Sequence, residues 1–221
     1  VSTDQVDATI NVKVPNKEIV KSGAYNVKLV KKSTSGIQLG GVKFTAKAII
    51  NGASEVDLNT EQNPLITDSG KLVDIGNTVT IDTDHVQTAD VYTLREYDIG
   101  DNKGYFIGIN KNIVLKVNKT SETSSDGSTI TNKVSGIELS IEGETATNNG
   151  TSSSITLSNG SKVTATLENN VITLTVENPE VTENGKYNVK LIKTVTDGTP
   201  LAGVKFTTKA VINGTPEVDL Y

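Results

Sequence analysis

The stretch Gly23–Leu58 reads GAYNVKLVKKSTSGIQLGGVKFTAKAIINGASEVDL, and it returns as Gly185–Leu220, GKYNVKLIKTVTDGTPLAGVKFTTKAVINGTPEVDL. Roughly two thirds of the aligned positions are identical, without a gap, as in a tandem repeat. An earlier segment, Ile10–Glu18 (INVKVPNKE), stands in the same register as Ile172–Glu180 (ITLTVENPE). The chain therefore contains one whole repeat and parts of two others, which predicts a tandem array of small domains.

The composition and the alternation of apolar residues predict an all-β fold. The chain is rich in Thr, Val, Asn, Ser, Gly and Ile, residues of strands and tight turns, and it has no Cys, Met or Trp. Short alternating segments separated by turn signals predict a β-sandwich without helices. The predicted strands are Tyr25–Lys31, Val42–Ile50, Thr78–Asp82, Val91–Tyr97, Ile113–Val117, Gly136–Ile141, Ser153–Leu157, Lys162–Leu167 and Val171–Glu177.

Two polar runs contain few apolar residues. They are Asn118–Asn132 and Glu142–Ser154. We expect them to form long, mobile hairpin tips, because they offer little to pack against a core.

The charge pattern excludes two classes of partner. The net charge is only -5, and both signs are mixed along the sequence. There is no basic stripe to hold nucleic acid and no polybasic or long apolar segment for a membrane. The first residues lack the regions of a signal peptide, so we expect any targeting signal of a secreted protein to lie outside this sequence. No cofactor is expected.

Three predicted strands carry an apolar row that ends in a polar group. In the first strand, Val27 and Leu29 share a face with Lys31. In the second, Tyr92 and Leu94 share a face with Glu96. In the third, Ile172, Leu174 and Val176 share a face with Asn178. An amine, a carboxyl and a carboxamide thus stand in phase with the core, where a charge is costly unless it is compensated. The three residues are therefore predicted to form one buried group.

The internal repeats keep these inward positions. Lys31 corresponds to Lys193, whereas its neighbour Lys32 is replaced by Thr194. Asn178 corresponds to Asn16, whereas the residues that follow these two asparagines differ. We take Asn16 and Lys193 as the equivalent crosslink positions of flanking repeats. An alternative interpretation of the Asn16 region, as a pilin lysine motif around Lys17, is disfavoured because the counterpart segment has no lysine.

A buried Lys, Glu and Asn at one point can form a covalent bond. Desolvation lowers the pKa of the lysine and raises that of the carboxyl, which favours a neutral amine beside a protonated acid. An amine held against an amide carbonyl gains a large effective molarity, and Glu96 can polarise that carbonyl and carry the proton. The predicted product is a Lys31–Asn178 isopeptide bond, made once rather than by enzymatic turnover. A buried ion pair, or a lysine that reaches solvent at a strand end, is the alternative.

The same residues carry a family resemblance. The segments YNVKLVKKSTSGIQLGGVKF, YTLREYDIGDNKGY and VITLTVEN resemble the first strand, the E-box and the last strand of collagen-adhesin B-type domains, also called SpaA-like or prealbumin-like domains, of Gram-positive pilins and adhesins. The resemblance implies an Ig-like, Greek-key sandwich and a spontaneous isopeptide bond between Lys31 and Asn178, assisted by Glu96. It also implies a location on the bacterial cell surface. The usual E-box proline is missing from Asp101–Tyr105, and the region after Tyr105 is longer than usual.

The domain boundaries follow from the repeats. Residues 1–18 are expected to be the last strands of a preceding repeat, 19–180 a complete repeat, and 181–221 the opening strands of a following one. The expected partners are neighbouring repeats or copies of the same protein in a fibre.

The predicted function is a structural module of a bacterial surface fibre, a pilus or adhesin stalk. The alternative is an adhesin domain that binds a host or matrix ligand through the two polar runs. A carbohydrate-binding accessory module is disfavoured because aromatic residues are scarce. The residues Asp82, Asp84 and His85 also invite a metal interpretation. No second cluster supplies further ligands, so we expect a turn and no metal.

Overall fold

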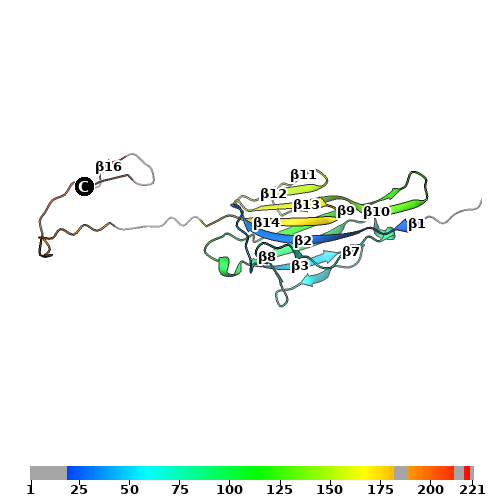
Figure 1. The fold of residues 1–221 in the computed structure, drawn as a ribbon, viewed down its shortest axis with the longest axis horizontal. Coiled ribbons are helices and arrows are strands. Elements are labelled where there is room, and N and C mark those ends of the chain that lie inside the picture. Colours follow the sequence, from blue (N-terminus) through cyan, green and yellow to red (C-terminus); the bar gives the residue numbers. More distant parts are fainter. Residues whose placement is uncertain (1–18, 182–188, 212–216, 220–221) are drawn as a thin grey trace, which may run out of the picture. The chain divides into compact units, whose positions relative to one another are not determined.

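The computed structural model describes residues 19–181, 189–211 and 217–219 (Figure 1). The chain divides into two compact units, one within residues 1–182 and the other within residues 183–221. Each unit is described by itself below.

The first unit is a sandwich of two sheets, as the sequence predicts. In the first sheet the strand order is β1-β10-β9-β8-β3-β4, with β5 also on β3, and all pairs are antiparallel except β1 with β10. Its strands are β1 (Ile19–Lys21), β3 (Lys43–Ile49), β4 (Val56–Asn59), β5 (Leu65–Ile66), β8 (Asp90–Asp98), β9 (Asn112–Thr123) and β10 (Thr129–Ser140).

The second sheet contains the first long strand and the last strand of the unit. The order is β11-β12-β13-β14-β2-β6, with β7 also on β2. Its strands are β2 (Ala24–Ser33), β6 (Val73–Asp74), β7 (Val79–Thr80), β11 (Thr147–Asn148), β12 (Ser152–Thr156), β13 (Lys162–Glu168) and β14 (Val171–Asn178). Every strand predicted above overlaps a strand of the structure, so the all-β sandwich is confirmed.

The strands β2 and β14 lie side by side and run parallel (Figure 1). Their register places Leu29 opposite Leu174 and Lys31 opposite Val176. Because their residues alternate between buried and partly exposed, each strand sends every second side chain into the space between the sheets. The beginning and the end of the domain are therefore joined through one pair of hydrogen-bonded strands.

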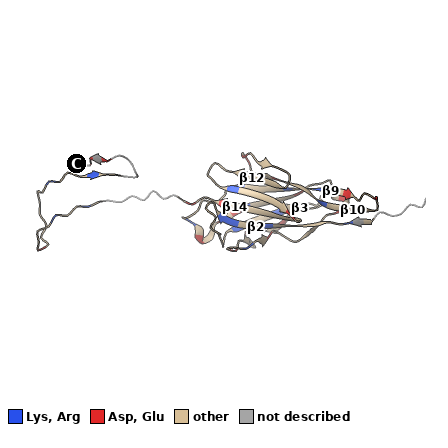
Figure 2. Cartoon of the chain, turned by 45° about the horizontal axis from the view of Figure 1, so that its top comes forward, with Lys and Arg blue, Asp and Glu red and all other residues tan. Residues whose placement is uncertain are grey.

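The core between the sheets is almost entirely aliphatic. Among the largest fully buried side chains are Leu29, Ile113 and Leu115, with Tyr25, Tyr92 and Phe44 as the buried aromatics. In the view of Figure 2, lysine, arginine and acidic residues are scattered singly along the strands. Burial of the alternating apolar residues thus accounts for the fold.

The two polar runs were predicted to be long hairpin tips, and the structure bears this out only in part. Most of Asn118–Asn132 belongs to the β9–β10 hairpin, which leaves only a short turn between Thr123 and Thr129. The Glu142–Ser154 run contains β11 and the beginning of β12. The polar inward residues are held by hydrogen bonds instead of apolar packing; for example, Ser121 Oγ donates to Asn132 Oδ1 at 2.7 Å.

The expectation of no helix is wrong in detail. Short 3-10 helices occur at Thr83–His85 and Gly100–Asn102. The first is capped by Asp82, whose Oδ1 accepts a bond of 3.0 Å from the Asp84 amide. A side chain that satisfies the free amide of the first turn explains why this acidic segment turns tightly.

The second unit has little regular structure in the residues described. Its strands β15 (Lys209–Ala210) and β16 (Val218–Asp219) pair antiparallel. Lys193 lies outside a strand and is exposed. Asn16 lies outside the described residues.

Candidate functional site

Lys31, Glu96 and Asn178 come together between the sheets. Lys31 lies near the end of β2 and Asn178 at the end of β14, so the parallel pairing of these strands brings both residues to the same end of the second sheet. Glu96 comes from β8 on the opposite sheet. The three residues are 2%, 3% and 0% exposed, respectively. We call these three side chains the first polar cluster.

The contacts within the first polar cluster all pass through the Glu96 carboxyl. Lys31 Nζ lies 3.6 Å from Glu96 Oε2, and Asn178 Nδ2 donates to Glu96 Oε1 at 2.7 Å. Lys31 Nζ also donates a long bond of 3.4 Å to the Val176 carbonyl of β14. The carboxyl therefore stands between the amine and the amide, as a proton carrier between them must.

Burial changes the acid–base behaviour of Lys31. Desolvation lowers the pKa of its amine from 10.5 to about 8, and the nearby carboxyl of Glu96 only partly opposes that shift. Removing an ammonium from water is costly, and a single partner at 3.6 Å repays only part of that cost. About a tenth of the amine is therefore neutral and nucleophilic at pH 7, far more than for a lysine in water.

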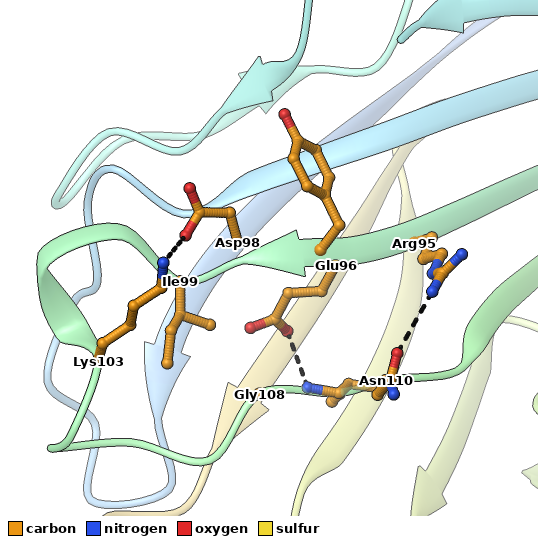
Figure 3. A pocket seen from close by; sticks show the side chains of 9 residues that line it. Arg95, Glu96, Asp98, Ile99, Lys103, Gly108 and Asn110 are labelled. Carbon is orange, nitrogen blue, oxygen red and sulfur yellow. Dashed lines mark hydrogen bonds and ion pairs between the residues drawn. The ribbon is translucent and has the colours of Figure 1, made fainter. Parts of the chain in front are cut away.

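The segment after the second 3-10 helix closes over Glu96. The Ile109 amide donates to Glu96 Oε2 at 3.4 Å (Figure 3). A Cβ at Gly108 would lie 3.2 Å from Glu96 Oε1 and 3.1 Å from Ile99 Cγ2, so only glycine fits there without displacement. A surface pocket lined by Glu96, Ile99 and Gly108, among others, adjoins the carboxyl.

The carbonyl of the Asn178 side chain is buried without a hydrogen-bond donor from the protein. An unpaired buried polar atom costs about 1–3 kcal/mol, so its presence needs a reason. The two ends of a carboxamide have nearly the same shape, and a half-turn of the amide exchanges Oδ1 and Nδ2. After that half-turn, Oδ1 faces the Glu96 carboxyl, which in its protonated form can donate to it and polarise the carbonyl for attack.

Sequence reasoning missed a second group of buried charges. Lys119 and Asp90 have fully buried side chains, and Lys119 Nζ lies 2.6 Å from Asp90 Oδ1. The signal was present, because Lys119 follows Ile113, Leu115 and Val117 in period-two alternation, the same pattern that marks Lys31. It was overlooked because the run from Asn118 was expected to form a mobile hairpin tip without packed side chains.

The acidic segment with His85 forms a local network. The His85 ring Nδ1 is 2.7 Å from Asp82 Oδ2, and Asp82 also caps the helix. In the part of the chain that the structure describes, no three His, Cys, Asp or Glu side chains are arranged to hold a metal ion. Within those residues there is also no helix of the length and apolarity that a membrane span requires.

Comparison with known proteins gives only distant likenesses. No protein-family model matches the chain, and neither does any curated protein. Among solved structures, the open conformation of the pilus adhesin SpaC from Lactobacillus rhamnosus GG has a TM-score of 0.38 at 14% identity, over 75% of this chain and 16% of that chain. A C-terminal fragment of the same adhesin has a TM-score of 0.36 at 12% identity, over 74% of this chain and 48% of the fragment. The chain spans less than half the length of these structures, and at this level of similarity its function is inferred from the site itself.

Proposed function

We propose that the domain is a structural module of a bacterial surface fibre, locked by an intramolecular isopeptide bond between Lys31 and Asn178. The observation that carries the proposal is the first polar cluster: a buried amine of lowered pKa, a carboxyl and a carboxamide, in contact between the first long strand and the last strand. The sequence repeat and the resemblance of the three motifs to pilin domains support the fibre role. Such a module is extracellular, on a Gram-positive cell wall, and does not act as an enzyme on other molecules.

The reaction balances without an outside reagent. Lys31 gives a proton to Glu96, and the freed lone pair of Nζ attacks Cγ of Asn178. Protonated Glu96 holds the carbonyl oxygen by a hydrogen bond, delivers its proton to Nδ2 and then takes a second proton from Nζ. The Nζ–Cγ bond forms, the Cγ–Nδ2 bond breaks, and ammonia leaves with the proton that Lys31 carried. The carboxyl is regenerated, and water, whose exclusion favours the amide product, takes no part.

The position of this bond would allow the domain to carry tension along a fibre. It would join β2 to β14, and so close a loop of 147 residues, from the difference between positions 178 and 31. Chain-entropy reasoning gives such a closure about 5 kcal/mol of stability. Tension that enters one terminal strand would pass through the amide into the other, leaving the strands in between unloaded. In an array, Asn16 and Lys193 would serve the flanking repeats in the same way.

Single-molecule force spectroscopy tests this mechanical role. With the chain pulled from its two ends, the wild type should extend without releasing the residues between Lys31 and Asn178. Lys31→Met cannot form the amide, and should release those residues in an unfolding event of about 500 Å, at about 3.4 Å per residue. The neighbouring Lys32→Met is the matched control, since Lys32 lies on the same strand and pairs with Glu177 near the surface.

A wild-type chain that unfolds with the same length increment as Lys31→Met would contradict the mechanical role. The Lys32→Met chain should behave like the wild type, so that loss of a lysine from this strand is separated from loss of the reactive one.

A further inference from the structure

A second group of amine, carboxyl and amide side chains lies in the first sheet. Asn51 lies two residues after the end of β3, Asp90 begins β8, and Lys119 lies on β9. These strands are neighbours in the order β9-β8-β3 (Figure 1), and the contacts of Lys119 with Asn51 and Asp90 show that the three residues meet. Asp90 and Glu96 stand at opposite ends of β8. We call Asn51, Asp90 and Lys119 the second polar cluster.

The contacts of Lys119 join all three residues. Its Nζ lies 2.6 Å from Asp90 Oδ1 and 3.0 Å from Asn51 Oδ1. The side chains of Lys119 and Asp90 are 0% exposed. A lysine that is fully buried and directed at both a carboxyl and an amide carbonyl has the partners that an amide-forming reaction requires.

Asp90 is held in place by a dense set of donors. Its Oδ1 also accepts the Asn51 backbone amide at 2.7 Å, and its Oδ2 accepts the Tyr25 hydroxyl at 2.6 Å. Burial raises the pKa of Tyr92 to about 12 and that of Tyr25 still further, so both phenols remain protonated, and Tyr92 donates to the Tyr25 hydroxyl at 3.3 Å. The carboxylate is therefore fixed in position between the amine and the amide.

The Asn51 amide is polarised and has a path to solvent. The Asp82 backbone amide also points at Asn51 Oδ1, at 3.4 Å, so this oxygen faces two donors. Its Nδ2 donates to the Thr80 carbonyl at 2.9 Å, and both Asn51 and Thr80 line a surface pocket. The Asn51–Gly52 turn, with Asn51 at a φ of 50°, explains an asparagine here but does not explain a buried lysine and carboxylate on its amide.

We propose that Lys119 and Asn51 form a second intramolecular amide bond, with Asp90 as the proton carrier. Lys119 passes one proton to Asp90, its Nζ attacks Cγ of Asn51, and Asp90 moves a further proton from Nζ to Nδ2. The Nζ–Cγ bond forms, the Cγ–Nδ2 bond breaks, and ammonia leaves with the proton that was first passed to Asp90, while the third proton of the original ammonium stays on the new amide nitrogen. No oxidant, metal or cofactor is needed. This site shares no residue with the first polar cluster, so the bond does not depend on the proposed function.

The second bond would lock a different part of the sandwich. It would tie β3 to β9 across β8, within one sheet, whereas the first bond ties β2 to β14 in the other sheet. The second copy of the repeat keeps the asparagine as Asn213, within the same Ile-Asn-Gly sequence. A domain with both bonds would be closed covalently in each of its two sheets.

Tryptic mapping of the intact, folded chain tests the second bond directly. Trypsin does not cut after a lysine whose amine is in an amide, so the peptide of residues 117–133 should stay whole and be joined to the peptide of residues 48–71. The total mass of the wild type should be short by two ammonia molecules. Lys119→Arg keeps the charge beside Asp90 but cannot form the bond, and should restore one ammonia while the 29–32 and 163–186 peptides stay joined.

The peptide map shows whether the second bond is present, and the variants show whether it forms independently of the first. Folded wild-type protein in which trypsin cuts after Lys119 and the 48–71 peptide runs alone would overturn the proposal. Glu96→Gln should lose only the first bond and Asp90→Asn only the second, so failure of one bond is distinguishable from failure of the other. If Asp90→Asn does not fold, the wild-type map and Lys119→Arg decide the result by themselves.

Discussion

The two polar clusters contain the same chemical groups at opposite ends of β8, yet they are bonded differently. In the first, Lys31 is 3.6 Å from Glu96, and the Asn178 oxygen has no donor from the protein. In the second, Lys119 is 2.6 Å from Asp90, whose oxygens also accept a backbone amide and a tyrosine hydroxyl. The first cluster is under-bonded, whereas the second is saturated.

The contrast shows that burial alone does not set reactivity. A charge that is buried with few partners tends to give up its charge, whereas one with short, complementary bonds keeps it. Lys31 is in the first situation, and its pKa is lowered to about 8. Lys119 must break a short ion pair before its lone pair is free. We therefore expect both bonds, with the first forming faster.

The largest expected effect is the loss of the first bond. Glu96→Gln keeps the size of the side chain but removes the proton carrier, so Lys31 and Asn178 should remain unlinked. The free energy of unfolding should fall by about 5 kcal/mol, the contribution of the closed loop. Denaturant unfolding measures it, with the exposed Glu168→Gln as the control, which should leave the free energy unchanged. If Glu96→Gln were as stable as Glu168→Gln, the first bond would not stabilise the domain, and this distinction between the two clusters would be lost.

The next effect is a pH dependence that only the unlinked domain shows. In Asn178→Ala, Lys31 keeps its free amine, with a folded-state pKa near 8 against 10.5 when unfolded. Between these values the unfolded chain binds the extra proton, so stability should rise with pH, by up to about 3 kcal/mol. Below about pH 8 the full cost of burying the charge remains.

The matched variant is Lys31→Met combined with Asn178→Ala, which lacks the titrating amine. Denaturant unfolding of both chains from about pH 7 to about pH 10 isolates the lysine. A constant difference in unfolding free energy between them would show that burial does not lower the pKa of Lys31.

A smaller effect separates the rates of the two bonds. The extra hydrogen bonds on Asp90 should raise the barrier for Lys119 by about 1–3 kcal/mol, which corresponds to a rate about 5-fold to 150-fold lower. The chain can be made by cell-free synthesis and quenched in acid at successive times. The first species to appear, short by one ammonia, should have the peptide of residues 29–32 joined to the peptide of residues 163–186. A first product linked through residues 48–71 and 117–133 would reverse the comparison.

The smallest effect concerns the fit around Glu96. In Gly108→Ala the added methyl would sit 3.2 Å from Glu96 Oε1, so the carboxyl must move by a few tenths of an ångström. In the acid-quenched time course described above, the first bond should form more slowly than in the wild type, while the second bond should form at the same rate. Ser69→Ala, on the surface, is the control. Gly127→Ala is not suitable, because Gly127 has a φ of 70°, at which alanine is strained.

Local alternation was enough to predict the first cluster, and would have marked Lys119, one of the three residues of the second. Lys31, Glu96 and Asn178 each end a row of apolar residues, and their burial follows from that phase. Lys119 ends such a row as well, but its polar surroundings favoured a loop. Hydrogen bonds to other polar side chains, which periodicity does not register, keep that hairpin in the sheet.

The rest of the site depends on contacts between distant segments. Asn51 stands in a turn, where no alternation marks it, and its approach to Lys119 requires the strand order β9-β8-β3. The closure of Gly108 and Ile109 over Glu96 depends on a loop whose path no repeat or turn signal specifies. Sequence pattern locates inward residues, whereas sheet order decides which of them meet.

The most direct test of the central claim is the peptide map of the purified chain for the Lys31–Asn178 bond. The account predicts that the 29–32 peptide is joined to the 163–186 peptide with the loss of one ammonia, and that the joined species is absent from Glu96→Gln. Folded wild-type protein that yields these two peptides separately and at full mass would contradict it.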